Sequence, residues 1–155
     1  MSIDIRAMRP CYTKSLLDEL LARYSEWTPR LVLEQQDVPA KDRLWVVLRR
    51  GALPDRVLRL FAAECAEHAL LREREAGREP DARSFAAVSA ARQFARGEIN
   101  VAALRSARVY AAAYAAAYAA DAADAAAYAA DAADAAAERD AQVVDLLRIM
   151  DEEGL

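Results

Sequence analysis

Apolar residues recur at every third or fourth position in the first part of the chain. Between residues 13 and 27 they are Leu16, Leu17, Leu20, Leu21 and Tyr24. This spacing predicts a helix with one apolar face, which ends near Thr28 and Pro29.

Prolines and glycines divide the next stretch into segments of helical length. Proline suits the first turn of a helix, where its missing N–H is not needed, and glycine is common just after the last turn. On this basis we predict helices over residues 39–51, 54–77 and 80–97. Asn100 is a typical N-cap residue, and a further helix is expected to begin at Val101.

The C-terminal third is rich in alanine and contains no glycine or proline between Val101 and Gly154. Because alanine has the highest helix propensity, residues 101 to about 137 are predicted to form one helix about 55 Å long. A compact chain of this size is only about 40 Å across. The helix must therefore overhang the body, break near residues 138–140 or pack against a second copy. The last apolar residues are expected to dock on the core; they are Val143, Val144, Leu146, Leu147 and Met150.

Composition favours helices throughout. The 155 residues include 39 alanines, only 7% are aromatic, and β-branched residues are sparse between Val57 and Val143. Strands are enriched in β-branched and aromatic side chains. We therefore predict an all-α, bundle-like single domain over residues 1–155, with a long alanine-rich C-terminal helix.

Charge is divided unevenly along the chain. Residues 1–117 carry 19 basic and 15 acidic side chains, a net +4, whereas residues 118–155 carry two basic and ten acidic ones, a net −8. Such asymmetry favours a surface for a basic partner. The alternative is an intramolecular match, in which the acidic end lies across the basic body.

A ten-residue repeat lies within the predicted long helix, because the sequence YAADAADAAA at residues 118–127 recurs unchanged at 128–137. At 100° per residue its aspartates and Glu138 fall within an arc of about 140°, with tyrosines at the edge. The candidate partner-binding residues are Asp121, Asp124, Asp131, Asp134, Glu138, Tyr114, Tyr118 and Tyr128. This face is interpreted as solvated, as a docking surface for a basic protein, or as a nucleic-acid mimic. One carboxylate per about 5 to 6 Å makes the mimic sparsely charged beside the phosphates of a duplex.

Few residues in the sequence could carry chemistry. His68 is the only histidine, which excludes metal motifs that need two or more histidines. We expect it to be a packed residue on the apolar face that carries Phe61 and Cys65. Cys65 and His68 could hold half of a metal site, but no second pair has a suitable spacing. Catalytic residues, a metal and a cofactor are therefore not expected.

The sequence contains few signals of cellular location. The N-terminus has no basic and apolar leader, and no apolar stretch reaches the roughly 18 residues of a membrane span. Cys11 and Cys65 are expected to be reduced thiols. The prediction is a cytoplasmic protein that binds neither membrane nor nucleic acid directly.

Two motifs resemble a bacterial and phage family of putative immunity proteins. The first is Leu-Phe-Ala-Ala-Glu-Cys-Ala-Glu-His-Ala-Leu at residues 60–70, and the second is Ala-Arg-Gly-Glu-Ile at residues 95–99, after a helix rich in Ala and Arg. The resemblance covers about residues 39–137, between an N-terminal helical segment, about 1–38, and an acidic end, about 138–155. It departs at the last helix, which often contains Gly and His in the family and here contains the Ala/Asp/Tyr repeat.

The resemblance implies a small antidote that binds and blocks a toxin, without catalytic residues. We therefore expect a non-catalytic protein that neutralises a basic toxin or nuclease-like protein by stoichiometric binding. One alternative is a phage inhibitor of a host defence factor, acting through a face that mimics nucleic acid. Another is a structural helical protein that self-associates, as in a homodimer.

Overall fold

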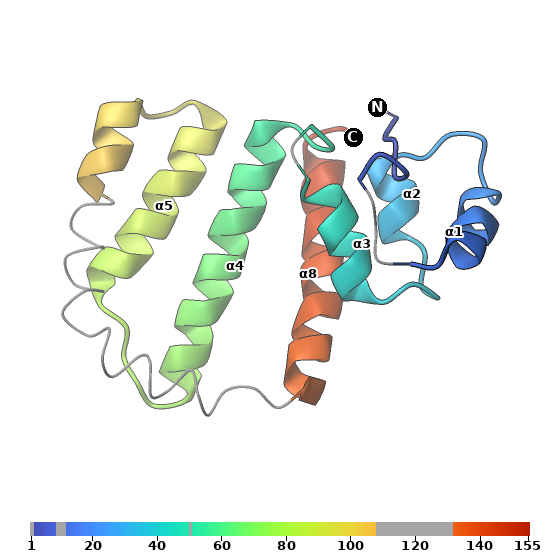
Figure 1. Cartoon of the computed structure of the whole chain (residues 1–155). Coiled ribbons are helices and arrows are strands. Elements are labelled where there is room, and N and C mark those ends of the chain that lie inside the picture. Colours follow the sequence, from blue (N-terminus) through green and yellow to red (C-terminus); the bar gives the residue numbers. More distant parts are fainter. Residues whose placement is uncertain (1, 9–11, 50, 108–131) are drawn as a thin grey trace.

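Helices make up all of the regular structure in the described residues of the computed structural model, which are 2–8, 12–49, 51–107 and 132–155 (Figure 1). They are α1 (Lys14–Leu21), α2 (Pro29–Leu33), α3 (Ala40–Val47), α4 (Asp55–Glu75), α5 (Ala82–Arg96) and α8 (Ala132–Glu152). Residues 101–107 are also helical. The all-α prediction is therefore confirmed.

Side-chain caps start several of these helices where polar residues precede them. The Thr28 hydroxyl accepts a hydrogen bond from the Leu31 N–H at 3.2 Å, and Asp81 caps α5 through the Arg83 N–H. The Asn100 side chain accepts bonds from the N–H groups of Ala102 and Ala103, both at 3.0 Å. Each cap satisfies N–H groups that have no partner inside the helix, so Asn100 has the predicted role.

The first predicted helix is shorter than its apolar pattern indicates. Residues 13–27 were expected to be helical, but α1 ends at Leu21. Trp27 is buried, with 8% of its surface exposed, and its indole N–H donates to the Leu21 carbonyl at 3.3 Å. A turn between the two residues lets the indole reach the core, and Thr28 then starts the separate helix α2.

The longest helices pack side by side around α4. Helix α8 lies between α4 and α3 and also contacts α2, whereas α5 packs on the other side of α4 (Figure 1). One apolar cluster joins α2, α3, α4 and α8, and its most deeply buried side chains are Leu33, Val47, Val57 and Leu146. In the described part of the chain, no helix is both long and apolar enough to cross a membrane.

Helix α8 docks on this core as its apolar positions predict. Val143, Leu146 and Met150 are buried, although Val144 is 65% exposed. The helix continues through residues 138–140, so the chain does not break there. Residues 108–131 lie outside the described part, and with them most of the helix predicted over residues 101–137.

Candidate functional site

Most of the predicted binding surface falls outside the described residues. This applies to Tyr114, Tyr118, Asp121, Asp124, Tyr128 and Asp131. Asp134 belongs to α8, but its side chain is also outside the description. Glu138 is the one predicted surface residue whose contacts are known.

Glu138 faces α4 and is bound within the chain. Its carboxylate forms an ion pair with the Arg72 guanidinium and accepts a hydrogen bond from the Gln142 side-chain amide at 2.9 Å. Its side chain is 22% exposed. Glu138 therefore joins α8 to α4 and is largely covered from solvent on that side.

Glu138 is one end of a series of charged contacts along the α4–α8 boundary. The other contacts are Arg56 Nε–Glu153 Oε2 at 2.6 Å, Arg148 Nη2–Glu64 Oε1 at 2.7 Å and His68 Nδ1–Asp145 Oδ2 at 3.6 Å. Residue numbers rise along α4 as they fall along α8, so the helices run antiparallel. The contacts fix the register between the helices on one edge of the apolar cluster.

The remaining acidic residues near the C-terminus are also paired. Asp140 contacts the buried Arg43 of α3 at 3.3 Å, and Asp151 pairs with Arg30 of α2. Glu152 pairs with Arg148 at 2.8 Å. All six acidic side chains from residue 138 onward thus have a basic partner in the same chain. For this part of the acidic end, the charge asymmetry is an intramolecular match.

Arg92 extends the charged contacts from α4 to α5. Its Nη2 lies 2.7 Å from Glu64 Oε2 and 2.5 Å from Glu67 Oε2. The hydrogen bond from Arg92 lowers the pKa of Glu67, and the two carboxylates raise the pKa of Arg92. Glu64 therefore receives a guanidinium on each oxygen, one from α5 and one from α8.

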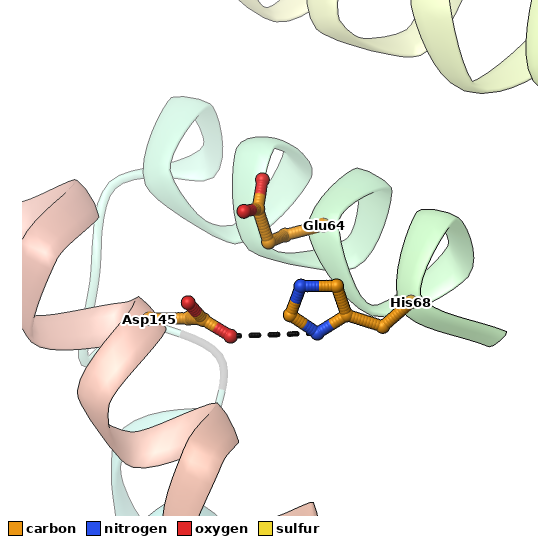
Figure 2. A group of neighbouring side chains, drawn as sticks. All are labelled: Glu64, His68 and Asp145. Atoms are coloured by element: carbon orange, nitrogen blue, oxygen red, sulfur yellow. Dashed lines mark ion pairs between the residues drawn. The ribbon is translucent and has the colours of Figure 1, made fainter. Parts of the chain in front are cut away.

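His68 lies at the edge of the α4–α8 boundary and its side chain is 32% exposed, so it is less enclosed than a core residue. Figure 2 shows Glu64 and His68 on α4 and Asp145 on α8; Asp145 and His68 face each other, and the Glu64 carboxylate is turned away from this pair. One potential ligand atom from each lies within 4.8 Å of the others. The four-residue spacing of Glu64 and His68 in the sequence places both on one helix face. Asp145 joins them only through the packing of α8.

Cys65 is a free thiol that is partly buried against the apolar cluster. Burial raises its pKa, and the negative charges of Glu138 and Asp145 raise it further. A thiol needs a lowered pKa to act as a nucleophile near neutral pH. The surroundings of Cys65 therefore favour a packing role.

Comparison with known proteins identifies the family. The profile described as Imm-5 like putative immunity protein matches residues 52–143, more than half of the chain, from the segment before α4 into α8. No curated protein and no solved structure matches. The matched region contains both motifs at residues 60–70 and 95–99. The chain therefore belongs to the family of Imm-5 like putative immunity proteins, which suggests a role in immunity.

Proposed function

We propose that this protein is an antidote that neutralises a basic toxin by stoichiometric binding, without catalysis. The family provides the immunity role. The observation that supports a basic partner is the concentration of acidic residues without basic ones in residues 118–137.

The acidic residues of the C-terminal region fall into two groups. The six from residue 138 onward are matched by Arg43, Arg72 and other basic groups of the same chain. Residues 118–137, in contrast, contain four aspartates and no basic residue. We assign the surface for a basic partner to Asp121, Asp124, Asp131 and Asp134, whose side chains lie outside the described part, with Glu138 at its border.

Tyrosines make such a surface suitable for arginine and lysine. Tyr118 and Tyr128 lie in this segment and Tyr114 lies just before it. An aromatic ring attracts a cation over its face, and tyrosine is enriched in protein interfaces. Complementary charge raises the association rate and makes it sensitive to salt.

The partner can be identified by capturing proteins from the native host with the tagged full chain, at about 50 mM and about 300 mM salt. We expect a basic protein to be retained in a one-to-one complex at low salt and weakened at high salt. The product of the neighbouring open reading frame is the first protein to test in purified form. A stable oligomer with no partner, measured by native mass spectrometry, would instead support self-association.

A charge-matched pair of variants tests the surface itself. The test variant replaces Asp121, Asp124, Asp131 and Asp134 with asparagine. The control neutralises four other exposed carboxylates through Asp55→Asn, Glu79→Gln, Asp151→Asn and Glu152→Gln, whose side chains are 81%, 69%, 67% and 58% exposed. Both variants change the net charge from −4 to 0. We expect only the test variant to lose most of its affinity, and equal loss in both would contradict the proposed surface.

A further inference from the structure

We propose that Glu64, His68 and Asp145 form a zinc site that joins α4 to α8. Asp145 and His68 face each other across the helix boundary (Figure 2), and one potential ligand atom from each of the three side chains lies within 4.8 Å of the other two. Their exposed fractions are 20%, 32% and 18%. The site is thus sheltered but open to exchange with solvent.

One of the three distances between ligand atoms is close to that in a zinc coordination sphere. Zinc bonds of about 2.0 to 2.2 Å in tetrahedral geometry place neighbouring ligand atoms about 3.3 Å apart. His68 Nδ1 and Asp145 Oδ2 are already 3.6 Å apart. The third ligand, a Glu64 oxygen, must rotate toward this pair, because the three ligand atoms lie within 4.8 Å of one another rather than at about 3.3 Å.

The chemistry of the ligands selects the metal. Imidazole favours zinc and other transition metals, whereas magnesium and calcium prefer oxygen ligands alone. Three protein ligands leave one position for water in a four-coordinate site. One histidine and two carboxylates therefore fit zinc better than they fit magnesium or calcium.

When no metal is bound, Arg148 provides the positive charge beside the carboxylates of Glu64 and Asp145. Its Nη2 lies 2.7 Å from Glu64 Oε1 and 3.7 Å from Asp145 Oδ1, while its Nη1 holds Glu152 at 2.8 Å. The side chain is 45% exposed. When zinc takes Glu64 and Asp145, Arg148 can turn outward and keep its bond to Glu152.

Arg92 keeps its position when zinc binds. It holds the other Glu64 oxygen, Oε2, at 2.7 Å and is itself fixed by Glu67 at 2.5 Å. Residues that hydrogen-bond to metal ligands orient those ligands and affect metal affinity. Asp145 also lies just beyond the family match, which ends at residue 143. The complete site therefore combines two residues of the matched region with one that follows it.

The proposal is tested by titrating chelator-treated full-length protein with zinc, using calorimetry and the thermal unfolding temperature, Tm. We expect one zinc per chain and a rise in Tm, because a ligand that binds only the folded state stabilises it. Magnesium and calcium at the same concentration should leave Tm unchanged. His68→Ala and Asp145→Asn should each weaken zinc binding at least about tenfold. Loss of a residue that only hydrogen-bonds to a metal ligand already lowers metal affinity by about that factor. Arg148→Gln should bind zinc more tightly, because the competing cation is gone.

Two control variants separate this site from other ways to bind zinc. Glu153→Gln removes another carboxylate of the α4–α8 boundary, whose side chain is 18% exposed like that of Asp145, and it should bind zinc as the wild type does. The double variant Cys11→Ser/Cys65→Ser should also retain zinc, and bound cobalt should show no thiolate charge-transfer band. Wild-type affinity in His68→Ala, or loss of zinc in the double cysteine variant, would overturn the proposal. Because no readout involves a partner protein, the result is independent of the proposed toxin binding.

Discussion

Helix α4 has a different neighbour on each side, and the two are attached by different interactions. Helix α8 contributes Val143, Leu146, Ile149 and Met150 to the apolar cluster, each no more than 4% exposed. Helix α5 buries Val88 and two alanines, Ala90 and Ala95. Burying a large aliphatic side chain contributes about 1.5 to 3 kcal/mol, whereas a methyl group contributes less. The apolar contribution to stability is therefore concentrated on the α8 side.

The α5 side compensates with arginines that lie over its aromatic residues and pair with acids. The Arg59 guanidinium lies 5.2 Å from the centre of the Phe94 ring, and Arg74 lies 4.7 Å from that of Phe85. Arg92 connects α5 to two carboxylates of α4. We infer that α8 is held by large buried aliphatic side chains together with its charged contacts, whereas α5 packs on α4 through smaller buried side chains, arginine–ring contacts and the pairs of Arg92. Substitutions on the two sides can test this difference.

The largest effect is expected for Leu146→Ala. Leu146 is fully buried at 0% exposure, so its loss leaves a cavity in the apolar cluster. The free energy of unfolding should fall by about 3 kcal/mol, measured by urea denaturation with circular dichroism. Val144→Ala is the control on the same helix, because Val144 is 65% exposed, and it should change stability by no more than about 0.5 kcal/mol. Equal effects would contradict the docking of α8 by this face.

A smaller effect is expected on the α5 side for Arg92→Met, which keeps an unbranched apolar side chain like the aliphatic part of arginine and removes the charged guanidinium. Losing the bonds to Glu64 and Glu67 should lower stability by about 1 to 2 kcal/mol near neutral pH, since the pairs are partly exposed. The control is Arg78→Met, whose pair with Glu73 is roughly half exposed on both sides. It should cost less than about 1 kcal/mol.

The effect of Arg92→Met should also depend on pH. Because Arg92 lowers the pKa of Glu67 in the folded state, this pair stabilises the protein above the unfolded glutamate pKa of about 4.3. That contribution is lost as pH falls through the lower folded pKa. The stability difference between wild type and variant should therefore shrink below about pH 4. A difference that stays constant down to that range would assign the effect to packing.

The sequence predicts those parts of the fold that depend on neighbouring residues. Prolines and glycines locate α4 and α5 to within a few residues, because their backbone preferences are local. Apolar periodicity gives the wrong end for α1, because the apolar spacing continues past Leu21 although the helix ends there. Trp27 ends the pattern by entering the core, and periodicity does not distinguish a turn that buries an indole from another turn of helix.

The charged contacts could not be predicted in the same way, because they join residues far apart in the chain. Helical phase groups Glu138 with the aspartates before it, but phase within one helix does not indicate which neighbour it meets. In the structure Glu138 meets Arg72. Likewise, Glu64 and His68 are recognisable as a pair on α4, whereas Asp145 becomes their neighbour only when α8 docks. The opposite net charges of the two parts of the chain indicated that they could form ion pairs with each other. Which residues pair depends on tertiary packing.

The smallest effect is expected for Gly97→Ala at the end of α5. Gly97 has a φ of +78°, and an added Cβ would meet no atom within 4 Å. The substitution should therefore cost only the backbone strain of a left-handed alanine, about 1 kcal/mol. Hydrogen exchange should be faster at the α5 end, where the Glu98 N–H donates to the Gln93 carbonyl at 2.9 Å, with no greater change in α8 than in the rest of the core. A loss as large as that of Leu146→Ala would mean that α5 and α8 depend on each other through α4, and the two sides would then form one cooperative unit.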